Sequence, residues 1–142
     1  MTSFVDTSFL FSLYVPDVNS AVAAAKMQRA NFPLHLTDLG EVEMANAIAL
    51  RLFRKELQPS EAKNVLSLFR KDVEEGVARI VPLSALAYQL AGQIAELHTP
   101  RLGTRTLDVL HVAAALALKA DAFYTFDRKQ AQLASAVGLR VR

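Results

Sequence analysis

Three aspartates of this chain stand at positions where a carboxylate can do chemistry. Asp6 ends the short apolar stretch SFV, Asp127 ends the later stretch AFYTF, and Asp108 comes just before the apolar run VLHVAAALAL. Carboxylates gathered in one place raise one another's pKa, and a hard divalent cation such as Mg²⁺, which prefers oxygen ligands, removes that penalty. The three residues therefore predict a site where acidic side chains share a metal ion.

The composition indicates one folded domain, which we expect to span residues 1–142. Hydrophobic residues make up 52% of the chain and charged residues 21%, with only 5 glycines and 5 prolines, a balance typical of a packed domain. Because cysteine is absent, disulfides, zinc thiolates and cysteine nucleophiles are excluded, which fits a cytoplasmic protein. We expect neither a targeting sequence nor a membrane span, since no apolar run reaches about 18 residues.

The charge balance is compatible with a polyphosphate substrate. The chain has 16 Lys and Arg against 14 Asp and Glu, a net charge of +2. If several of the acids are gathered in one site, the rest of the surface carries an excess of positive charge, which attracts nucleic acid. A solvated surface explains the same basic residues equally well.

Short apolar stretches alternate with helical patterns along the whole chain. Strands are expected at residues 3–5, 33–37, 77–83, 122–126 and 139–141, and helices at 19–31, 39–57, 61–75, 85–98, 106–119 and 128–137. Ser60 is the expected cap of the third helix, and TPRLGT an expected break after the fourth.

This alternation predicts a short-stranded parallel sheet between two helical layers, a three-layer α/β/α sandwich. In such sheets, ligands bind beyond the carboxyl ends of the strands, where the strand order reverses. Asp6 and Asp127 both follow strands, whereas Asp121 precedes one and is not expected in the site.

Four stretches of the sequence resemble, in order and spacing, the motifs of the PIN domain family, and most closely its VapC-type ribonuclease toxins. They are FVDTSFL, EMANAI, LDVLHVAAALAL and YTFDRKQAQLASAVGLRV. The resemblance implies that Asp6, Glu43, Asp108 and Asp127 bind Mg²⁺ or Mn²⁺ and catalyse RNA hydrolysis, leaving 5′-phosphate and 3′-hydroxyl ends. It also implies a homodimer and a small antitoxin protein as inhibitor.

Each aspartate also has a simpler structural explanation. Asp6 and Asp127 are suited to cap the helices that follow them. Asp108 lies in the first turn of a helix, where a carboxylate stabilises the helix dipole by about 0.3–1 kcal/mol. That helix is almost wholly apolar, however, so Asp108 is expected to be buried and to need a cation as partner.

Glu43 is selected by the resemblance and not by helical periodicity. A helical wheel places the apolar stripe of its helix nearer to Glu41, which stays the alternative. The residues of that stripe are Val42, Ala45, Ile48, Ala49, Leu52 and Phe53.

Further residues are expected to support the site. The hydroxyls of Thr7 and Thr125 are suited to orient carboxylates, and Arg105 and Arg128 to contact a substrate phosphate. Arg128 occupies a place where some PIN relatives have another acid or amide, which argues against a fully occupied second metal site. His111 is either a general base or metal ligand, or, as we favour, a core histidine with one hydrogen bond.

Two other functions are compatible with parts of the sequence. A phosphatase of the haloacid-dehalogenase type also has a strand that ends in Asp, but it needs a second Asp where this chain has Ser8. An α/β module that binds RNA or a protein partner without catalysis is the alternative that we retain.

Overall fold

The computed structural model describes all 142 residues and contains one parallel sheet. Its strands are β1 (Ser3–Val5), β2 (Leu34–Thr37), β3 (Ala78–Val81) and β4 (Ala122–Tyr124). Their order is β3-β2-β1-β4, and every pairing is parallel. Because β2 and β3 are added on one side of β1 and β4 on the other, the strand order reverses between β1 and β4.

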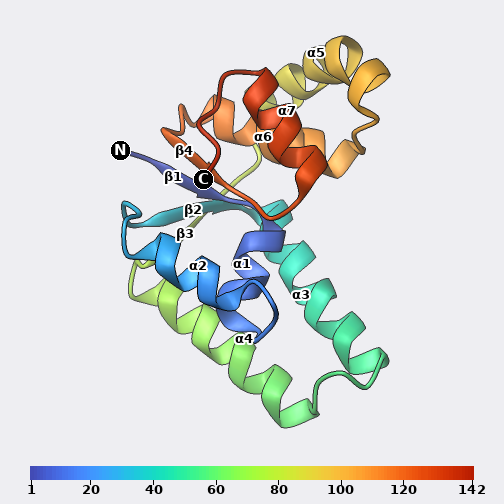
Figure 1. Cartoon of the computed structure of the whole chain (residues 1–142). Coiled ribbons are helices and arrows are strands. Elements are labelled where there is room, and N and C mark those ends of the chain that lie inside the picture. Colours follow the sequence, from blue (N-terminus) through green and yellow to red (C-terminus); the bar gives the residue numbers. More distant parts are fainter.

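Helices cover both faces of this sheet (Figure 1). On one face lie α1 (Thr7–Tyr14), α2 (Ser20–Met27), α3 (Asp38–Phe53) and α4 (Pro59–Glu74). On the other lie α5 (Ala85–Leu102), α6 (Thr106–Ala117) and α7 (Arg128–Ala136). The predicted three-layer sandwich is confirmed. None of these helices is both long enough and apolar enough to cross a membrane.

The central strands supply both hydrophobic cores because their side chains alternate between the two faces. Val5 and Tyr124 belong to the core under α1–α4, and Phe4 and Phe123 to the core under α5–α7. Phe4 is paired with Phe123 in the sheet, and their rings stack with centroids 5.6 Å apart. This contact fixes the register of β1 against β4, and with it the positions of the residues that follow them.

Helix α1 was not expected from the sequence. Its residues Phe9, Leu10, Phe11 and Ser12 are all buried, so its apolar side chains do not form the single stripe of an amphipathic helix. It begins because Asp6 caps it, accepting a hydrogen bond from the backbone N–H of Phe9 at 2.9 Å.

Several predicted boundaries were wrong. Helix α4 begins at Pro59, not after Ser60, and the N–H of its cap residue Gln58 is bonded to Glu61 at 2.9 Å; proline is well tolerated at this first position. Helix α5 continues through the expected break to Leu102. It ends at Gly103, whose φ of 64° is easily adopted only by glycine.

Other predicted elements are shorter than expected: α2 ends at Met27 and not at residue 31, β3 at Val81 and not at 83, and β4 at Tyr124 and not at 126. Helix α3 ends at Phe53 and not at residue 57, since Lys55 adopts a left-handed conformation with φ 58°. The predicted fifth strand is reduced to one bridge between Val141 and Phe123.

Candidate active site

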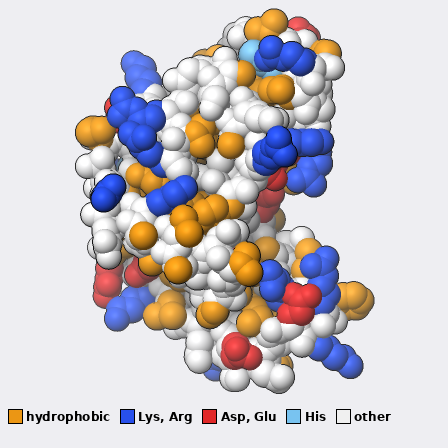
Figure 2. Space-filling model, viewed as in Figure 1, with side chains coloured by type: hydrophobic (Ala, Val, Ile, Leu, Met, Phe, Trp, Pro, Cys, Tyr) orange, Lys and Arg blue, Asp and Glu red, His pale blue; other side chains and the backbone are white.

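A polar pocket of about 120 Å³ lies at the carboxyl ends of β1 and β4, and all four predicted acids line it. The lining contains no hydrophobic residue and consists of Asp6, Thr7, Ser8, Glu43, Arg105, Asp108, His111, Asp127 and Gln130. On this side of the molecule, Figure 2 shows an indentation in which acidic side chains are visible, with basic side chains above and below it. The pocket thus lies where the strand order reverses, as expected for a parallel sheet.

Asp6 is the most deeply buried of the four acids, with 2% of its surface exposed. Its Oδ1 accepts hydrogen bonds from the Phe9 N–H at 2.9 Å and the Ser8 hydroxyl at 2.8 Å. Its Oδ2 accepts a hydrogen bond from the hydroxyl of Thr125, which follows β4. Asp6 therefore caps α1 and also joins the ends of the two central strands.

Burial raises the pKa of Asp6 to about 6, although the hydrogen bonds from Thr125, Phe9 and Ser8 and the charge of His111 act in the opposite direction. The hydrogen bonds do not fully replace the water that the carboxylate has lost. Loss of water around its carboxylate is therefore the main influence on the pKa of Asp6.

Glu43 reaches the same pocket from α3 and is half-buried. Its Oε1 accepts a hydrogen bond from the Thr7 hydroxyl at 2.9 Å and contacts Nε2 of His111. Burial alone would raise the pKa of Glu43, but the hydrogen bond and charge of His111, the Thr7 hydroxyl and the charge of Arg105 together hold it below its ordinary value. Glu43 is thus ionised and oriented by two partners.

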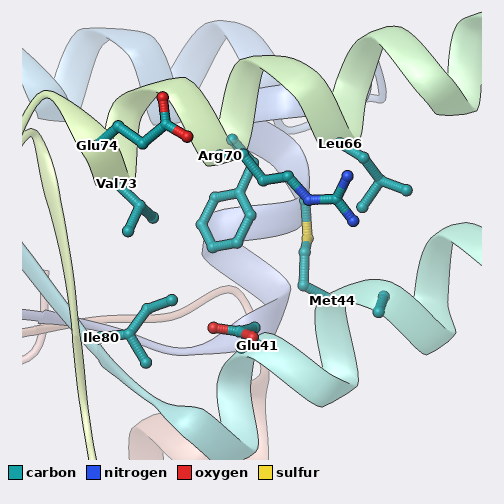
Figure 3. Close-up of a pocket in the computed structure, with 9 residues that line it drawn as sticks. Glu41, Met44, Leu66, Arg70, Val73, Glu74 and Ile80 are labelled. Carbon is teal, nitrogen blue, oxygen red and sulfur yellow. The ribbon is translucent and has the colours of Figure 1, made fainter.

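Glu41, the alternative to Glu43, is exposed and lies outside this pocket. It lines a separate cavity of about 260 Å³ between α3, α4 and β3, together with Met44, Phe69 and Arg70. Figure 3 shows Glu41 beside this cavity, below Arg70 of α4. Of the two glutamates, only Glu43 shares a pocket with the three aspartates.

The helical wheel of α3 pointed the wrong way because the helix has a solvent-exposed apolar face. Val42 and Phe53 of the predicted stripe are 66% and 84% exposed. The buried residues of α3 are Gly40, Met44 and Ile48, and Glu43 borders that line.

Asp108 and Asp127 complete the acidic lining. Asp108 is 8% exposed, and its Oδ2 accepts a hydrogen bond from Nε of Arg105 at 3.3 Å. Asp127 caps α7, accepting a hydrogen bond from the Gln130 N–H at 2.8 Å. The Thr125 hydroxyl accepts a hydrogen bond from the Asp127 N–H at 2.9 Å, so Thr125 contacts both Asp6 and Asp127.

Of two further residues in the lining, sequence reasoning missed Gln130 and noted Ser8 only as a hydroxyl near Asp6. Ser8 donates to Asp6 and also accepts a hydrogen bond from the Phe126 N–H at 3.0 Å. Gln130 is buried in α7, and its amide nitrogen lies 3.4 Å from the Asp108 carbonyl oxygen. A buried glutamine beside Leu133 and Ala134 is unusual, but only the fold reveals that its side chain reaches α6.

His111 and Arg128 occupy different settings. His111 is buried in α6 with one hydrogen-bonding contact, to Glu43, while its Nδ1 has no partner. Arg128 is exposed at the start of α7 and does not line the pocket, whereas Arg105 does.

The chemistry of the lining fits a divalent cation, although the acids are not arranged as a finished coordination shell. No three of the acidic and histidine side chains form a group ready to hold a metal ion, since Glu43 faces Thr7 and His111 while Asp108 faces Arg105. Four carboxylates in one small pocket are nevertheless the donors that Mg²⁺ and Mn²⁺ prefer, and a bound cation would favour the ionised form of Asp6, whose pKa is raised by burial.

Comparisons with known proteins identify the family and the fold. The sequence matches the PIN domain over residues 3–136. It matches none of the curated proteins that were searched.

Three solved structures illustrate the similarity in fold. The first is Mycobacterium tuberculosis VapC20, described as a Sarcin-Ricin loop cleaving toxin, with a TM-score of 0.68 at 19% identity over 97% of this chain and 96% of that one. The second is FitAcB from Neisseria gonorrhoeae, with a TM-score of 0.70 at 19% identity over 99% of this chain and 96% of that one. The third is VapBC2 from Rickettsia felis, in a structure described as bound to a DNA fragment from their promoter. Its TM-score is 0.70 at 14% identity over 100% of this chain and 98% of that one. Because the sequence match extends over nearly the whole length, the chain belongs to the PIN domain family.

Proposed function

We propose that this protein is a metal-dependent endoribonuclease and the toxin of a toxin–antitoxin pair. The observation that carries the proposal is the convergence of Asp6, Glu43, Asp108 and Asp127 on one pocket. Membership of the PIN family and likeness in fold to VapC20, a toxin that cleaves the Sarcin-Ricin loop, support it.

In this proposal the four acids hold Mg²⁺ or Mn²⁺, and the chain's other polar groups keep them in place. When bound, the metal would activate water and offset negative charge on the phosphate. Ser8 and Thr125 orient Asp6, while Thr7 and His111 orient Glu43.

Basic residues around the acids would contact the substrate. The Arg105 side chain is 80% exposed beside Asp108, so its free guanidinium nitrogens can bind a phosphate at the pocket. We assign Arg128, which lies outside the lining, to a phosphate farther along the strand. Hydrolysis by water at this site would leave 5′-phosphate and 3′-hydroxyl ends.

We infer a small antitoxin protein and a second copy of the chain as partners. The likeness in fold to FitAcB and VapBC2 supports the antitoxin. Large apolar side chains on α3 and α5 support the homodimer, because exposed apolar surface commonly marks an interface. The most exposed of them are Val42, Phe53 and Leu97.

The decisive experiment compares RNA cleavage by wild type and matched acid-to-amide variants with Mg²⁺, with Mn²⁺ and with EDTA. We expect cleavage by the wild type only with metal, and loss of cleavage in Asp6→Asn and Asp108→Asn. Glu41→Gln is the control, since Glu41 is exposed and outside the pocket. Equal cleavage by wild type and both aspartate variants would contradict the proposal, and RNA binding without cleavage would favour a non-catalytic module.

A further inference from the structure

A second groove adjoins the acidic pocket and is open to solvent. It has a volume of about 410 Å³ and shares Thr7, Ser8 and Asp127 with the pocket. Its opposite wall is formed by the later turns of α3, including Arg51, and by Arg54, the C-cap residue of that helix. An extended polymer that occupies the pocket can therefore continue into this groove along the protein surface.

One face of α3 connects the two cavities. Glu43 lies in the pocket, and Ala47, Arg51 and Arg54 lie in the groove at helical intervals of four, four and three residues, so they share a face. With a rise of 1.5 Å per residue, Arg51 is about 12 Å and Arg54 about 16 Å from Glu43 along the helix. Their guanidinium groups are placed to meet phosphates next to the one in the pocket.

The two arginines differ in how they are held. Arg51 forms an ion pair with Glu56 at 3.1 Å, and its guanidinium carbon lies 5.0 Å from the ring centroid of Phe11. Arg54 is exposed and has no carboxylate within 4.0 Å. Arg51 is thus fixed in the wall, whereas Arg54 can bind an anion without giving up an ion pair.

One acid, Asp17, lies in the groove besides the shared Asp127. Its carboxylate accepts hydrogen bonds from the Ser12 hydroxyl at 2.7 Å and the Asn19 N–H at 2.8 Å. Although burial opposes ionisation, these bonds, that of Ser20 and the charge of Arg51 hold the pKa of Asp17 below its ordinary value. The Asp17 carboxylate is therefore already bonded to neighbouring groups of the protein. The side of the groove that can bind an anion is the wall formed by α3.

We propose that this groove carries the RNA strand on one side of the cut, with Arg54 as the principal phosphate contact and Arg51 as a second. The inference rests on the proposed function, because it takes the substrate of the pocket to be RNA. Figure 2 is consistent with it, since basic side chains flank the indentation that contains the acids. Guanidinium groups bind phosphate through paired hydrogen bonds, independently of base sequence.

The test measures binding of a fluorescent single-stranded RNA by anisotropy, in EDTA and over a series of salt concentrations. We expect Arg54→Gln to weaken binding about three- to tenfold and to reduce the slope of log K against log salt by about 0.7, the value for one lost phosphate contact on a single strand. Arg54→Lys should keep the slope. Arg70→Gln is the matched control, because Arg70 is also an exposed helical arginine without an ion pair but lies in the other cavity.

Two outcomes separate this inference from the function on which it rests. If the wild type binds and cuts RNA while Arg54→Gln and Arg70→Gln have the same affinity and slope, the groove assignment is overturned and the nuclease stands. If the wild type neither binds nor cuts RNA, both proposals fail. Since Arg54 is exposed, thermal melting should show that its variants remain folded.

Discussion

The hydroxyl of Thr125 donates a hydrogen bond to the carboxylate of Asp6, and so joins the ends of the two central strands. The same oxygen accepts a hydrogen bond from the Asp127 N–H. One side chain thereby sets the relative positions of two acids that are far apart in the sequence.

Thr125→Val should remove both hydrogen bonds at nearly constant shape. It leaves Asp6 Oδ2 and the Asp127 N–H without their partner, so we expect a loss of about 1–3 kcal/mol in the free energy of unfolding. Urea denaturation followed by circular dichroism measures it. Thr125→Ser, which keeps the hydroxyl, should recover most of the loss; if it is as unstable as the valine variant, the hydrogen bonds are not the cause.

The stability of the metal-free protein should fall between about pH 4 and pH 6 because of Asp6. Its pKa is about 6 in the folded state against an ordinary 3.8, so in this interval the folded protein keeps a proton that the unfolded chain has lost. The contribution of Asp6 is fully present below pH 3.8 and is lost as the pH rises through 6.

Asp6→Asn should abolish this dependence. Measured by urea denaturation in EDTA, the free energy of unfolding of the variant relative to wild type should increase by up to about 3 kcal/mol from pH 4 to pH 7. Parallel pH profiles for the two proteins would show that Asp6 titrates normally.

Metal binding should stabilise the protein, because a cation relieves the repulsion among the four acids. At a free Mn²⁺ concentration 100 times the Kd, the expected gain is about 2.7 kcal/mol. Thermal melting across a Mn²⁺ titration tests this. Asp108→Asn should shift the titration to higher concentration, and a melting temperature that does not respond to Mn²⁺ in the wild type would contradict a metal site.

Glu43→Gln and Glu41→Gln form a matched pair on one helix. We expect Glu43→Gln to reduce Mn²⁺ affinity and RNA cleavage at least tenfold, because it removes one ionised carboxylate from the pocket. Glu41→Gln should leave both unchanged. Isothermal titration calorimetry and a cleavage assay measure the two effects; the reverse ranking would transfer the role to Glu41.

Phe123→Ala should destabilise the fold by about 3–5 kcal/mol, the usual range for a large aromatic core residue. Phe123 is fully buried and stacks on Phe4 across β1 and β4. Phe32→Ala is a control, since that ring is 53% exposed. A similar urea midpoint for both variants would show that the stack contributes little.

Four of the five predicted strands are present in the sheet, and two of them, β1 and β4, are short apolar runs followed by polar residues. Both were recognisable in this way; Asp6 follows β1 directly, and Asp127 comes three residues after the end of β4. Helix α1 was not recognisable, because its buried residues 9–12 are consecutive and do not repeat with an amphipathic period.

The site was only partly predictable for a related reason. The wheel of α3 failed because Val42 and Phe53 are apolar but exposed, so periodicity marked a surface and not the core. Ser8 could be noted from the sequence because it lies two residues from Asp6, whereas Gln130 gave no signal, since its contact to Asp108 depends on which elements meet in space.

Glu43 is carried by the helical layer α1–α4 and Asp108 by the layer α5–α7, so the two carboxylates belong to different hydrophobic cores. The sheet between the two layers and the contact of Glu43 with His111 of α6 hold them in one pocket. Any slippage between the layers would therefore separate the acids while each core stayed intact. Loss of activity should precede loss of helicity when the protein is slowly denatured.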